Sequence, residues 1–588
     1  MATAKRIFFG LFLFISITSA VYGQQVNIKI IQTTDEHGKI FPFDFTEGVP
    51  SNGSLAQVYS YVQSEREKQN QDVILLSNGD ILQGTPAVYY YNYEAPNESH
   101  VYSDVMNYMK YDAGTVGNHD IETGHPVYDK FNKSINFPWL AANAVHVESK
   151  EPYFQPYTVI EKRGLKIAVL GLITPAIPKW LPQNIWSGIL FEDMIETAEL
   201  WARIIQANEN PDLLVGLFHA GVDYTYAEQA DTTYKNENAS ELVAKRVPGF
   251  DMVYVGHDHH GWNKYVENNF GDKVLILGGT SSARNVAVAD VTFNFDSTNN
   301  VWNKDISGSI IEMKDYQPDP IFLSKFNYAF DETQKYVNRT IGEFTSSISA
   351  RESIFGNSSF TDLIHTIQMD LTGADISLTA PLSMDSIIDS GIVTVGDMFN
   401  LYRYENLLYT MELSGQEIKD YLEYSYASWF NTMDSPEDNL LQFRRNENGD
   451  LILSNRSGRA ELNYRFYNFD SAFGIDYTVD VTKPIGKKIR IEQFTDGSEF
   501  NLDKKFKVAV NSYRGNGGGG HLVEGARIPA DKLSERVITS TDKDLRYYLM
   551  KWIENKGKVT PKAYGNWKVI PENFWNAAKV KDYNLLYN

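Results

Sequence analysis

Five short apolar runs in the first half of the chain end in side chains that can bind a divalent metal ion. No cysteine occurs in the chain, so thiolate ligands, thiolate catalysis and disulfides are excluded. Carboxylate, imidazole and amide oxygen without sulfur suit zinc, manganese or iron rather than copper(I) or clusters. The runs and the groups that end them are Ile30–Thr34 with Asp35-Glu36-His37, Val73–Ser77 with Asn78-Gly79-Asp80, Ala113–Val116 with Gly117-Asn118-His119-Asp120, Leu213–Phe218 with His219, and Met252–Val255 with Gly256-His257-Asp258-His259.

Each of these groups is weak evidence by itself. An Asp-x-His or Asn-His after a strand is more often a turn with a surface histidine than a metal site. Taken together they are stronger, because five of the eleven histidines stand directly after apolar runs, beside Asp and Asn. Chance placement explains this pattern poorly.

A pair of divalent ions would give such a set a definite chemistry. Two ions about 3.5–4 Å apart can share one carboxylate and clamp a phosphoryl group. They also lower the pKa of a bound water and stabilise the charge that develops during in-line displacement. The pattern therefore predicts hydrolysis of a phosphate ester.

An α/β layered domain must position these side chains. Between Val26 and about Phe295, short apolar runs alternate with amphipathic segments, which predicts buried strands and covering helices. In open α/β sheets ligands bind just beyond the carboxyl ends of the strands, so the metal-binding groups should meet in one crevice. The predicted strands are Ile28–Gln32, Val73–Leu76, Ala113–Val116, Ile167–Leu172, Leu213–Phe218, Met252–Val255 and Val274–Leu277, and the predicted helices include Leu55–Lys68 and Phe191–Ala207.

The second half of the chain predicts a separate α+β domain. Pro318-Asp319-Pro320 reads as a break before a helix that runs to Val337. We expect a metal-binding domain over residues 24–315, a linker helix over 316–340 and a second domain over 341–588. In that domain we expect helices at Asp362–Leu371, Gln416–Tyr426 and Asp544–Asn555 and strands at Tyr477–Val481 and Lys507–Val510.

Composition and the first residues bear on the compartment and the partners. The formal net charge of −21 argues against a nucleic acid polymer as ligand, whereas bound cations would still allow a small phosphorylated substrate. Lys5 and Arg6 precede the apolar run Ile7–Ile17 and then small residues, the layout of a signal peptide over residues 1–23. We expect export to a bacterial periplasm or cell envelope, with no membrane span after cleavage.

The order of the motifs resembles the calcineurin-like metallophosphoesterases, in particular the bacterial 5′-nucleotidase/UDP-sugar hydrolase family. "TTDEHG", "SNGDILQG", "GNHD", "FHAG" and "GHDHH" are similar to the five motifs of that family and occur in the same order. The resemblance implies an N-terminal four-layered α/β/β/α sandwich, a C-terminal α+β domain that binds the substrate, and two divalent metal ions such as zinc or manganese.

The resemblance also implies a role for each motif residue. One metal would be held by Asp35, His37 and His259, and the other by Asn118, His219 and His257, with Asp80 between them. His119 would bind neither metal and would donate a hydrogen bond to the phosphate or the leaving oxygen. The carboxylate that orients His119 would be Glu122, where the family usually has Asp, with Asp120 as the second candidate.

In the C-terminal domain the resemblance is looser. "SAFGIDY" and "VNSYRGNGGGG" are similar to the segments that carry two base-stacking aromatics, which places these at Phe473 and Tyr513. The alternative is that both rings only pack within a tyrosine-rich domain. The family's N-G-G-G-x-R segment is replaced by "SLTAPLSMDS" at residues 377–386, so its arginine is absent. Arg403 is a candidate replacement.

The leading functional hypothesis is an exported two-metal enzyme that hydrolyses small phosphate esters by attack of a metal-bound hydroxide on phosphorus. Nucleoside 5′-monophosphates are the first expected substrates. UDP-sugars, 2′,3′-cyclic nucleotides and sulfate or thiosulfate esters stay open as alternatives. A non-catalytic binding protein of the cell envelope is the alternative that is not an enzyme, motivated by the changed segment 377–386.

Overall fold

A computed structural model describes residues 25–454 and 457–588 of the chain. The predicted signal peptide therefore lies outside the described residues. Within the described part, no helix combines the length and the apolar character that a membrane span requires.

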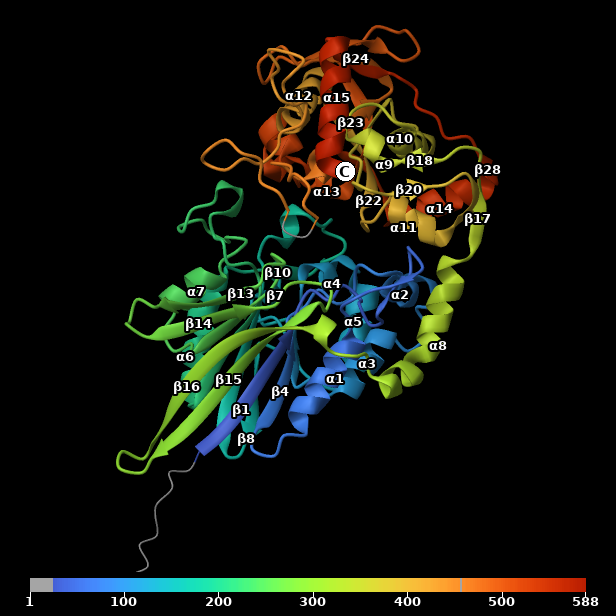
Figure 1. Ribbon diagram of the computed structural model, residues 1–588. Coiled ribbons are helices and arrows are strands. Elements are labelled where there is room, and N and C mark those ends of the chain that lie inside the picture. The colour runs from blue at the N-terminus through green and yellow to red at the C-terminus, as the bar shows by residue number, and fades with distance from the viewer. Residues whose placement is uncertain (1–24, 455–456) are drawn as a thin grey trace, which may run out of the picture.

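Two six-stranded mixed sheets form the centre of the N-terminal domain (Figure 1). Their strands are rich in Val, Ile and Leu, because both faces of each sheet are covered. Side chains such as Ile30, Ile74, Val169 and Val215 fill the space between the sheets. One sheet has the order β16 (Val301–Glu312), β15 (Asn285–Asp296), β1 (Gln25–Thr33), β4 (Asp72–Ser77), β5 (Ala113–Thr115), β6 (Trp139–Leu140), and the other β13 (Trp262–Glu267), β14 (Lys273–Gly278), β12 (Met252–Val255), β11 (Leu213–His219), β9 (Leu165–Ile173), β8 (Tyr157–Lys162).

Helices cover the outer face of each sheet. Leu55 and Val58 pack with Ile31 and Leu75 on the first sheet, and Ala198 packs on the second. These four layers confirm the predicted α/β/β/α sandwich. The covering helices are α1 (Leu55–Arg66), α3 (Val101–Met109) and α5 (His125–Ser134) on one side and α6 (Met194–Glu209) and α7 (Ser240–Arg246) on the other; the short helices α2 (Pro86–Tyr89) and α4 (Asn118–Glu122) and the strand pairs β2 (Phe43–Asp44) with β3 (Val49–Pro50) and β7 (Ala144–His146) with β10 (Ile189–Phe191) complete the domain.

Parallel pairing brings the carboxyl ends of the motif-bearing strands to one edge. β1 runs parallel to β4, with Thr33 opposite Ser77, and β4 runs parallel to β5. In the other sheet β11 runs parallel to β12. The five loops that follow these strands therefore lie at the same end of the sandwich, facing the second domain (Figure 1).

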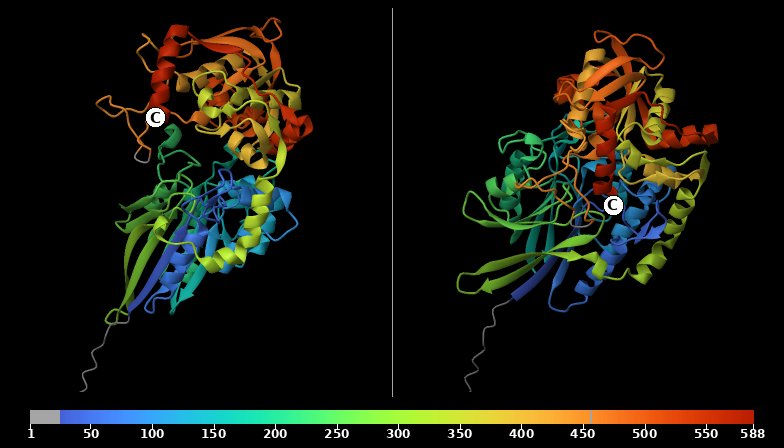
Figure 2. Two further views of the ribbon diagram at one scale, coloured as in Figure 1. Left: turned by 45° about the vertical axis from the view of Figure 1, so that its right-hand side comes forward. Right: turned by 45° about the horizontal axis from the view of Figure 1, so that its top comes forward.

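Helix α8 (Pro320–Val337) connects the two domains. Asp319 caps it by accepting a hydrogen bond from the amide of Phe322, and Pro320 occupies the first turn, where no amide donor is needed. The helix lies along the side of the molecule and contacts α1, α2 and α3 of the first domain and α11 of the second (Figure 2).

The C-terminal domain is built on a five-stranded sheet with helices packed on it. Its sheet has the order β23 (Ser471–Phe473), β19 (Ile376–Thr379), β26 (Lys505–Asn511), β22 (Leu407–Ser414), β27 (Val537–Asp544). The smaller sheets are β25 (Ile489–Phe494), β24 (Ile475–Asp480), β29 (Trp567–Ile570), then β21 (Gly391–Thr394), β17 (Thr340–Phe344), β28 (Lys558–Val559), and β18 (Ile348–Ser349) with β20 (Ile387–Ile388). The helices are α9 (Ala350–Ser353), α10 (Ser359–Thr372), α11 (Val395–Leu401), α12 (Gly415–Trp429), α13 (Ser512–Gly515), α14 (Leu545–Lys556) and α15 (Glu572–Tyr587).

A buried polar network joins the two domains. Tyr89 donates a hydrogen bond to Asp544 at 2.8 Å, and Tyr93 donates one to Glu405 at 3.1 Å. The guanidinium of Arg546 lies over the ring of Tyr89 at 4.9 Å and is 3.8 Å from Glu405. Both tyrosines come from the first domain and their partners from the second, so these contacts stabilise the observed arrangement of the domains.

Replacing Glu405 with Gln should remove a pH dependence of stability. Burial raises the pKa of Glu405 to about 8 from its ordinary value of 4.5. Between these values the folded protein holds a proton that the unfolded chain lacks, so the stabilisation is fully present below pH 4.5 and is lost as the pH rises through 8. Between pH 5 and pH 8.5, the thermal midpoint of the wild type should fall by at least about 2–4 °C more than the thermal midpoint of Glu405→Gln does. Parallel curves for the two proteins would contradict the assignment.

Candidate metal centre

Two clusters of nitrogen and oxygen donors stand where the motif-bearing loops meet. In each cluster the donor atoms lie within 4.8 Å of one another, and the clusters are Asp35, His37 and His259, and Asp80, His219 and His257. In the first, the Nε2 atoms of His37 and His259 are 3.1 Å apart, and His259 Nε2 is 3.4 Å from Asp35 Oδ1. In the second, His219 Nε2 is 3.1 Å from Asp80 Oδ2.

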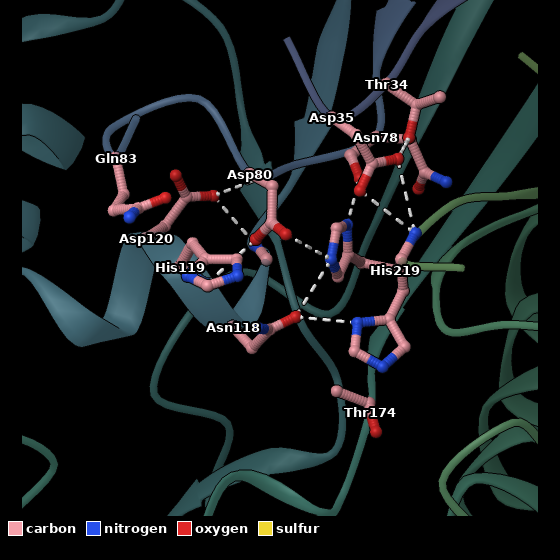
Figure 3. A network of polar contacts seen from close by, with 12 residues as sticks. Thr34, Asp35, Asn78, Asp80, Gln83, Asn118, His119, Asp120, Thr174 and His219 are labelled. Carbon is pink, nitrogen blue, oxygen red and sulfur yellow. Dashed lines mark hydrogen bonds and ion pairs between the residues drawn. The ribbon is translucent and has the colours of Figure 1, made fainter. Parts of the chain in front are cut away.

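Asn118 completes the second cluster. Its Oδ1 is 3.1 Å from His219 Nε2 and 2.9 Å from His257 Nδ1. Figure 3 shows the carboxylate of Asp80 between the ring of His219 and the loop that carries His119. The structure thus brings all seven predicted ligands to the two clusters, with Asp80 on the side of the second.

The backbone of these loops is held in a conformation that side chains rarely adopt. Five of the seven predicted ligands have positive φ, which costs about 1–3 kcal/mol at each such position and persists only when the surroundings impose it. The values are 51° for Asp35, 49° for His37, 58° for Asp80, 74° for His257 and 59° for His259. Such strain gathers at functional sites.

Two glycines allow the loops to approach this closely. A Cβ atom on Gly117 would lie 2.2 Å from Asp80 Oδ1, and one on Gly79 would lie 2.6 Å from the amide nitrogen of Gly117. Gly79 also has a φ of +83°. The glycines of "NGD" and "GNHD" are therefore required by the packing of Asp80 beside Asn118.

His119 is oriented by Glu122 and not by Asp120. Its Nδ1 is 2.5 Å from Glu122 Oε2, one turn along α4. The carboxylate of Asp120 instead accepts hydrogen bonds from four backbone amides, those of Gly117, Asp80, Ile81 and Leu82, at 2.8–3.0 Å. Asp120 therefore holds the loop that carries Asp80, and the longer Glu122 reaches His119.

Burial and neighbouring charges shift the pKa values of the site residues in both directions, and burial lowers the pKa of His37 to about 4. Burial raises the pKa of Asp80, but His219 and His119 outweigh it and hold the pKa well below its ordinary value. Burial lowers the pKa of His119, and the carboxylates of Asp80 and Glu122 outweigh it and raise the pKa to about 10. His219 follows the same pattern, with Asp80 raising its pKa to about 9. These shifts reflect how closely the carboxylates and imidazoles lie to one another, and a cation bound by His219 would replace the proton on its ring.

These residues fit divalent metal ions. Donor atoms of His37 and His259, and of Asn118 and His257, face each other at 2.9–3.1 Å, and carboxylates stand beside both pairs. Imidazole, carboxylate and amide oxygens in this combination suit zinc, manganese or iron. Each cluster thus has the donor types and the close spacing that a divalent metal ion needs.

Two residues that the sequence did not single out contact His257. Its Nε2 is 3.3 Å from Glu237 Oε1, and the ring of Trp180 stacks on it at 5.5 Å and 29°. Metal-ligating histidines usually have such a carboxylate partner. Both residues come from irregular loops, where hydrophobic periodicity gives no signal.

An aromatic cluster of the C-terminal domain adjoins this centre. Tyr513 lies in the short helix α13, two residues after the end of β26, and its pKa is raised by burial and by its neighbours Tyr467, Tyr226 and Glu237. The ring of Tyr467 lies 6.1 Å from that of Tyr404 at 78°. Asn516, three residues after Tyr513, donates a hydrogen bond to the carbonyl of Trp180, whose ring stacks on His257, so the segment that carries Tyr513 adjoins the second donor cluster.

Phe473 is placed away from Tyr513. Its ring stacks on the buried His365 at 6.0 Å and 25° and contacts Tyr564 at 4.9 Å. In the sheet, Phe473 of β23 lies opposite Ser377 of β19, and Ser377 in turn pairs with Ala509 of β26. Strand β19 therefore separates Phe473 from the strand that leads to Tyr513. The structure thus places Phe473 in the packing of the domain, whereas the carbonyl of Tyr467 accepts a hydrogen bond from Arg514, the residue after Tyr513.

Arg403 and the changed segment 377–386 lie in different surroundings. Arg403 is exposed and directly precedes Tyr404, a member of the aromatic cluster, so it lies at the rim of that cluster. Segment 377–386 begins in the buried strand β19, and the carbonyl of Met384 accepts a hydrogen bond from Tyr587 in α15 at 3.0 Å. That contact ties the segment to the last helix.

Comparison with known proteins identifies both halves. Residues 28–261 match the family described as calcineurin-like phosphoesterase, and residues 337–524 match the 5′-nucleotidase C-terminal domain. The trifunctional nucleotide phosphoesterase protein YfkN of Bacillus subtilis is 26% identical over 93% of this chain, which covers 39% of that relative. A 2′,3′-cyclic-nucleotide 2′-phosphodiesterase/3′-nucleotidase of Haemophilus influenzae is 25% identical, over 93% of this chain and 88% of that protein.

A solved structure shares the fold over nearly the whole chain. It is that of a Staphylococcus aureus protein assigned as a 5′-nucleotidase, with a TM-score of 0.74 and 20% identity. The match covers 92% of this chain and 99% of that one. The two-domain architecture is therefore shared beyond the motifs.

Proposed function

We propose that this protein, a metal-dependent phosphoric ester hydrolase of the 5′-nucleotidase type, hydrolyses small nucleotides with two divalent ions. The chain combines a calcineurin-like phosphoesterase domain with a 5′-nucleotidase C-terminal domain. The observation that carries the proposal is the pair of donor clusters beside the oriented His119. Residues 24–315 are proposed as the catalytic domain, 316–340 as the linker and 341–588 as the substrate-binding domain.

Each cluster is proposed to hold one ion. Asp35, His37 and His259 would bind the first, and Asn118, His219 and His257 the second. Asp80 is proposed to be shared by both. When bound, such ions supply an activated water and neutralise charge on the phosphoryl oxygens.

The protein's own groups then orient the substrate and move a proton. Glu122 occupies Nδ1 of His119, which leaves Nε2 as the ring nitrogen that meets the substrate. A protonated His119 donates from Nε2 to the leaving oxygen, while the carboxylate of Glu122 fixes the ring. Asp120 contributes by holding the backbone of the Asp80 loop through its four amide contacts.

Nucleoside 5′-monophosphates are the first proposed substrates. A second class, the 2′,3′-cyclic nucleotides, is supported by the relative of that name that aligns over 88% of its own length. Tyr513, Tyr467 and Tyr404 would contact the base, since aromatic faces stack bases. Arg403 at the rim is proposed to contact the phosphate or sugar.

Export to the cell envelope is proposed as well, and the signal-like residues 1–23 support it.

The test is hydrolysis of a defined panel by the protein, with phosphate release measured for 5′-AMP and p-nitrophenyl phosphate and the products of the other substrates separated by chromatography. Metal-stripped enzyme is supplied with manganese, zinc or cobalt and offered 5′-AMP, 2′,3′-cyclic AMP, UDP-glucose, p-nitrophenyl phosphate and a thiosulfate ester. We expect turnover of 5′-AMP or cyclic AMP to be lost on metal removal and restored by one of these ions. Metal-dependent cleavage of p-nitrophenyl phosphate without any nucleotide would reject nucleotides as substrates, and no turnover at all would favour a binding protein.

A further inference from the structure

We propose that the buried pair Asp470–Arg514 is a positioning element that fixes Tyr513 and Tyr467, the two aromatic side chains that hold the substrate's base. The inference rests on the proposed function, because it concerns how the organic part of a nucleotide is bound. It assigns roles to two residues that lie outside the metal centre.

Arg514 is directed into its own domain. Its side chain is buried, with a residue exposure of 1%. Nε and Nη2 donate to the two carboxylate oxygens of Asp470, each at 3.0 Å, in the bidentate geometry that makes such pairs strong. Nη1 donates to the carbonyl of Gly518 at 3.0 Å, and Nη2 also donates to that of Tyr467. With every nitrogen bonded internally, the guanidinium does not serve as a phosphate clamp in this arrangement.

Tyr513 is held by Arg514 in two ways. The centre of the guanidinium lies 5.2 Å from the centre of the tyrosine ring. Gly518, whose carbonyl accepts a hydrogen bond from Arg514, packs against the same ring. A Cβ atom on Gly518 would lie only 2.5 Å from Tyr513 Cε2. Fixing Gly518 therefore fixes the edge of the ring.

Tyr467 is held through its backbone. Its carbonyl accepts the Nη2 hydrogen bond of Arg514 at 2.6 Å, three residues before Asp470. Asp470 is itself anchored by a short hydrogen bond from Tyr421 in α12. One ion pair thus connects the segment that carries Tyr467 to the segment that carries Tyr513.

The same glycine-rich segment reaches the metal centre. Asn516, two residues after Arg514, donates a hydrogen bond to the carbonyl of Trp180 at 3.1 Å. Trp180 stacks on His257, a member of the second donor cluster. The glycine-rich segment that Arg514 binds is therefore held at a fixed position beside the second donor cluster. A surface that binds the base needs such a fixed position relative to the reacting phosphate.

The test compares a substrate that has a base with one that has none. Arg514→Lys keeps the charge but loses the fork, and Asp470→Asn removes its anchor. Steady-state kinetics of the metal-loaded full-length proteins are measured with 5′-AMP, 2′,3′-cyclic AMP and p-nitrophenyl phosphate. We expect KM for the nucleotide to rise about 5- to 100-fold, the range that base stacking supplies, with kcat/KM for p-nitrophenyl phosphate within about twofold of wild type.

Lys488→Met is the matched control. Lys488 is also a buried cation of this domain, and its ammonium donates to a backbone carbonyl, that of Phe430, at 2.6 Å. It should lower stability and leave the ratio of the two substrates unchanged. Thermal melts of all three variants report whether the second domain still unfolds cooperatively.

Each possible result either supports or overturns the positioning role of the Asp470–Arg514 pair. An unchanged nucleotide KM in both Arg514→Lys and Asp470→Asn overturns the positioning role while the proposed function stands. Loss of both substrates in equal proportion, or unfolding of both variants, assigns the pair a purely structural role and also overturns it. If wild-type enzyme cleaves p-nitrophenyl phosphate but neither cleaves nucleotides nor binds adenosine, the proposed function fails, and the inference fails with it.

Discussion

Replacing His119 with alanine should lower kcat for nucleotide substrates by about 10²–10⁴-fold and leave the metal content unchanged. That range is typical of removing a general acid. Its imidazole belongs to neither donor cluster, and only its backbone amide contacts Asp80, at 2.8 Å. The metal ions should therefore remain bound in the variant, which metal analysis of the purified protein checks directly.

Two further variants sharpen this prediction. Glu122→Gln keeps the shape but removes the charge beside His119 Nδ1, so it should lower kcat by about 10–100-fold, as loss of such an orienting partner does. His260→Ala is the matched control, because its side chain is 68% exposed although it neighbours a predicted ligand. Loss of metal in His119→Ala would show that His119 is a ligand and would reject its assignment as the proton donor.

Asp80→Asn should abolish hydrolysis by removing the carboxylate that we propose the two ions share. The amide keeps the volume of the side chain but lowers its affinity for cations, and ions of this kind contribute several kcal/mol to the transition state. We expect a loss of at least about 10³-fold in kcat/KM and a fall from two bound ions toward one or none. Isothermal titration of the stripped protein with manganese or zinc measures the stoichiometry.

The matched control for Asp80 is a carboxylate outside the clusters. Asp129 pairs with His125 at the surface of α5, with 32% of its side chain exposed, so Asp129→Asn should bind metal and turn over substrate as wild type does. Two ions bound with unchanged affinity in Asp80→Asn would rule out the shared position of this carboxylate. In that case, adding excess metal would change the activity of Asp80→Asn and of the wild type to the same extent.

The contacts of the C-terminal domain were predicted less completely from the sequence than those of the two donor clusters. "SAFGIDY" suggested a stacking ring at Phe473, but its side chain meets His365 and Tyr564 within the domain. Tyr467, six residues earlier, is instead joined through its carbonyl to Arg514, the residue after Tyr513. A one-dimensional pattern gives the presence of aromatics but not which face of the domain each one meets.

The sequence by itself determined the layered fold and the residues of the two donor clusters. Strand periodicity is a local property, and a parallel sheet places the ends of its strands at one edge, so the apolar runs that precede Asp35, Asp80 and His219 were sufficient. The order of the four layers, by contrast, was implied by the resemblance to the calcineurin-like metallophosphoesterases, and the structure confirms it.

The tertiary structure alone decided contacts between segments that lie far apart in the chain. Glu237 and Trp180 reach His257 from loops without periodicity, and Arg514 turns inward because Asp470, on another segment, supplies a buried counter-charge. A guanidinium or an indole has no local pattern that fixes its direction. The direction follows from which partners remove the cost of burying it, and these are known only once the chain has folded.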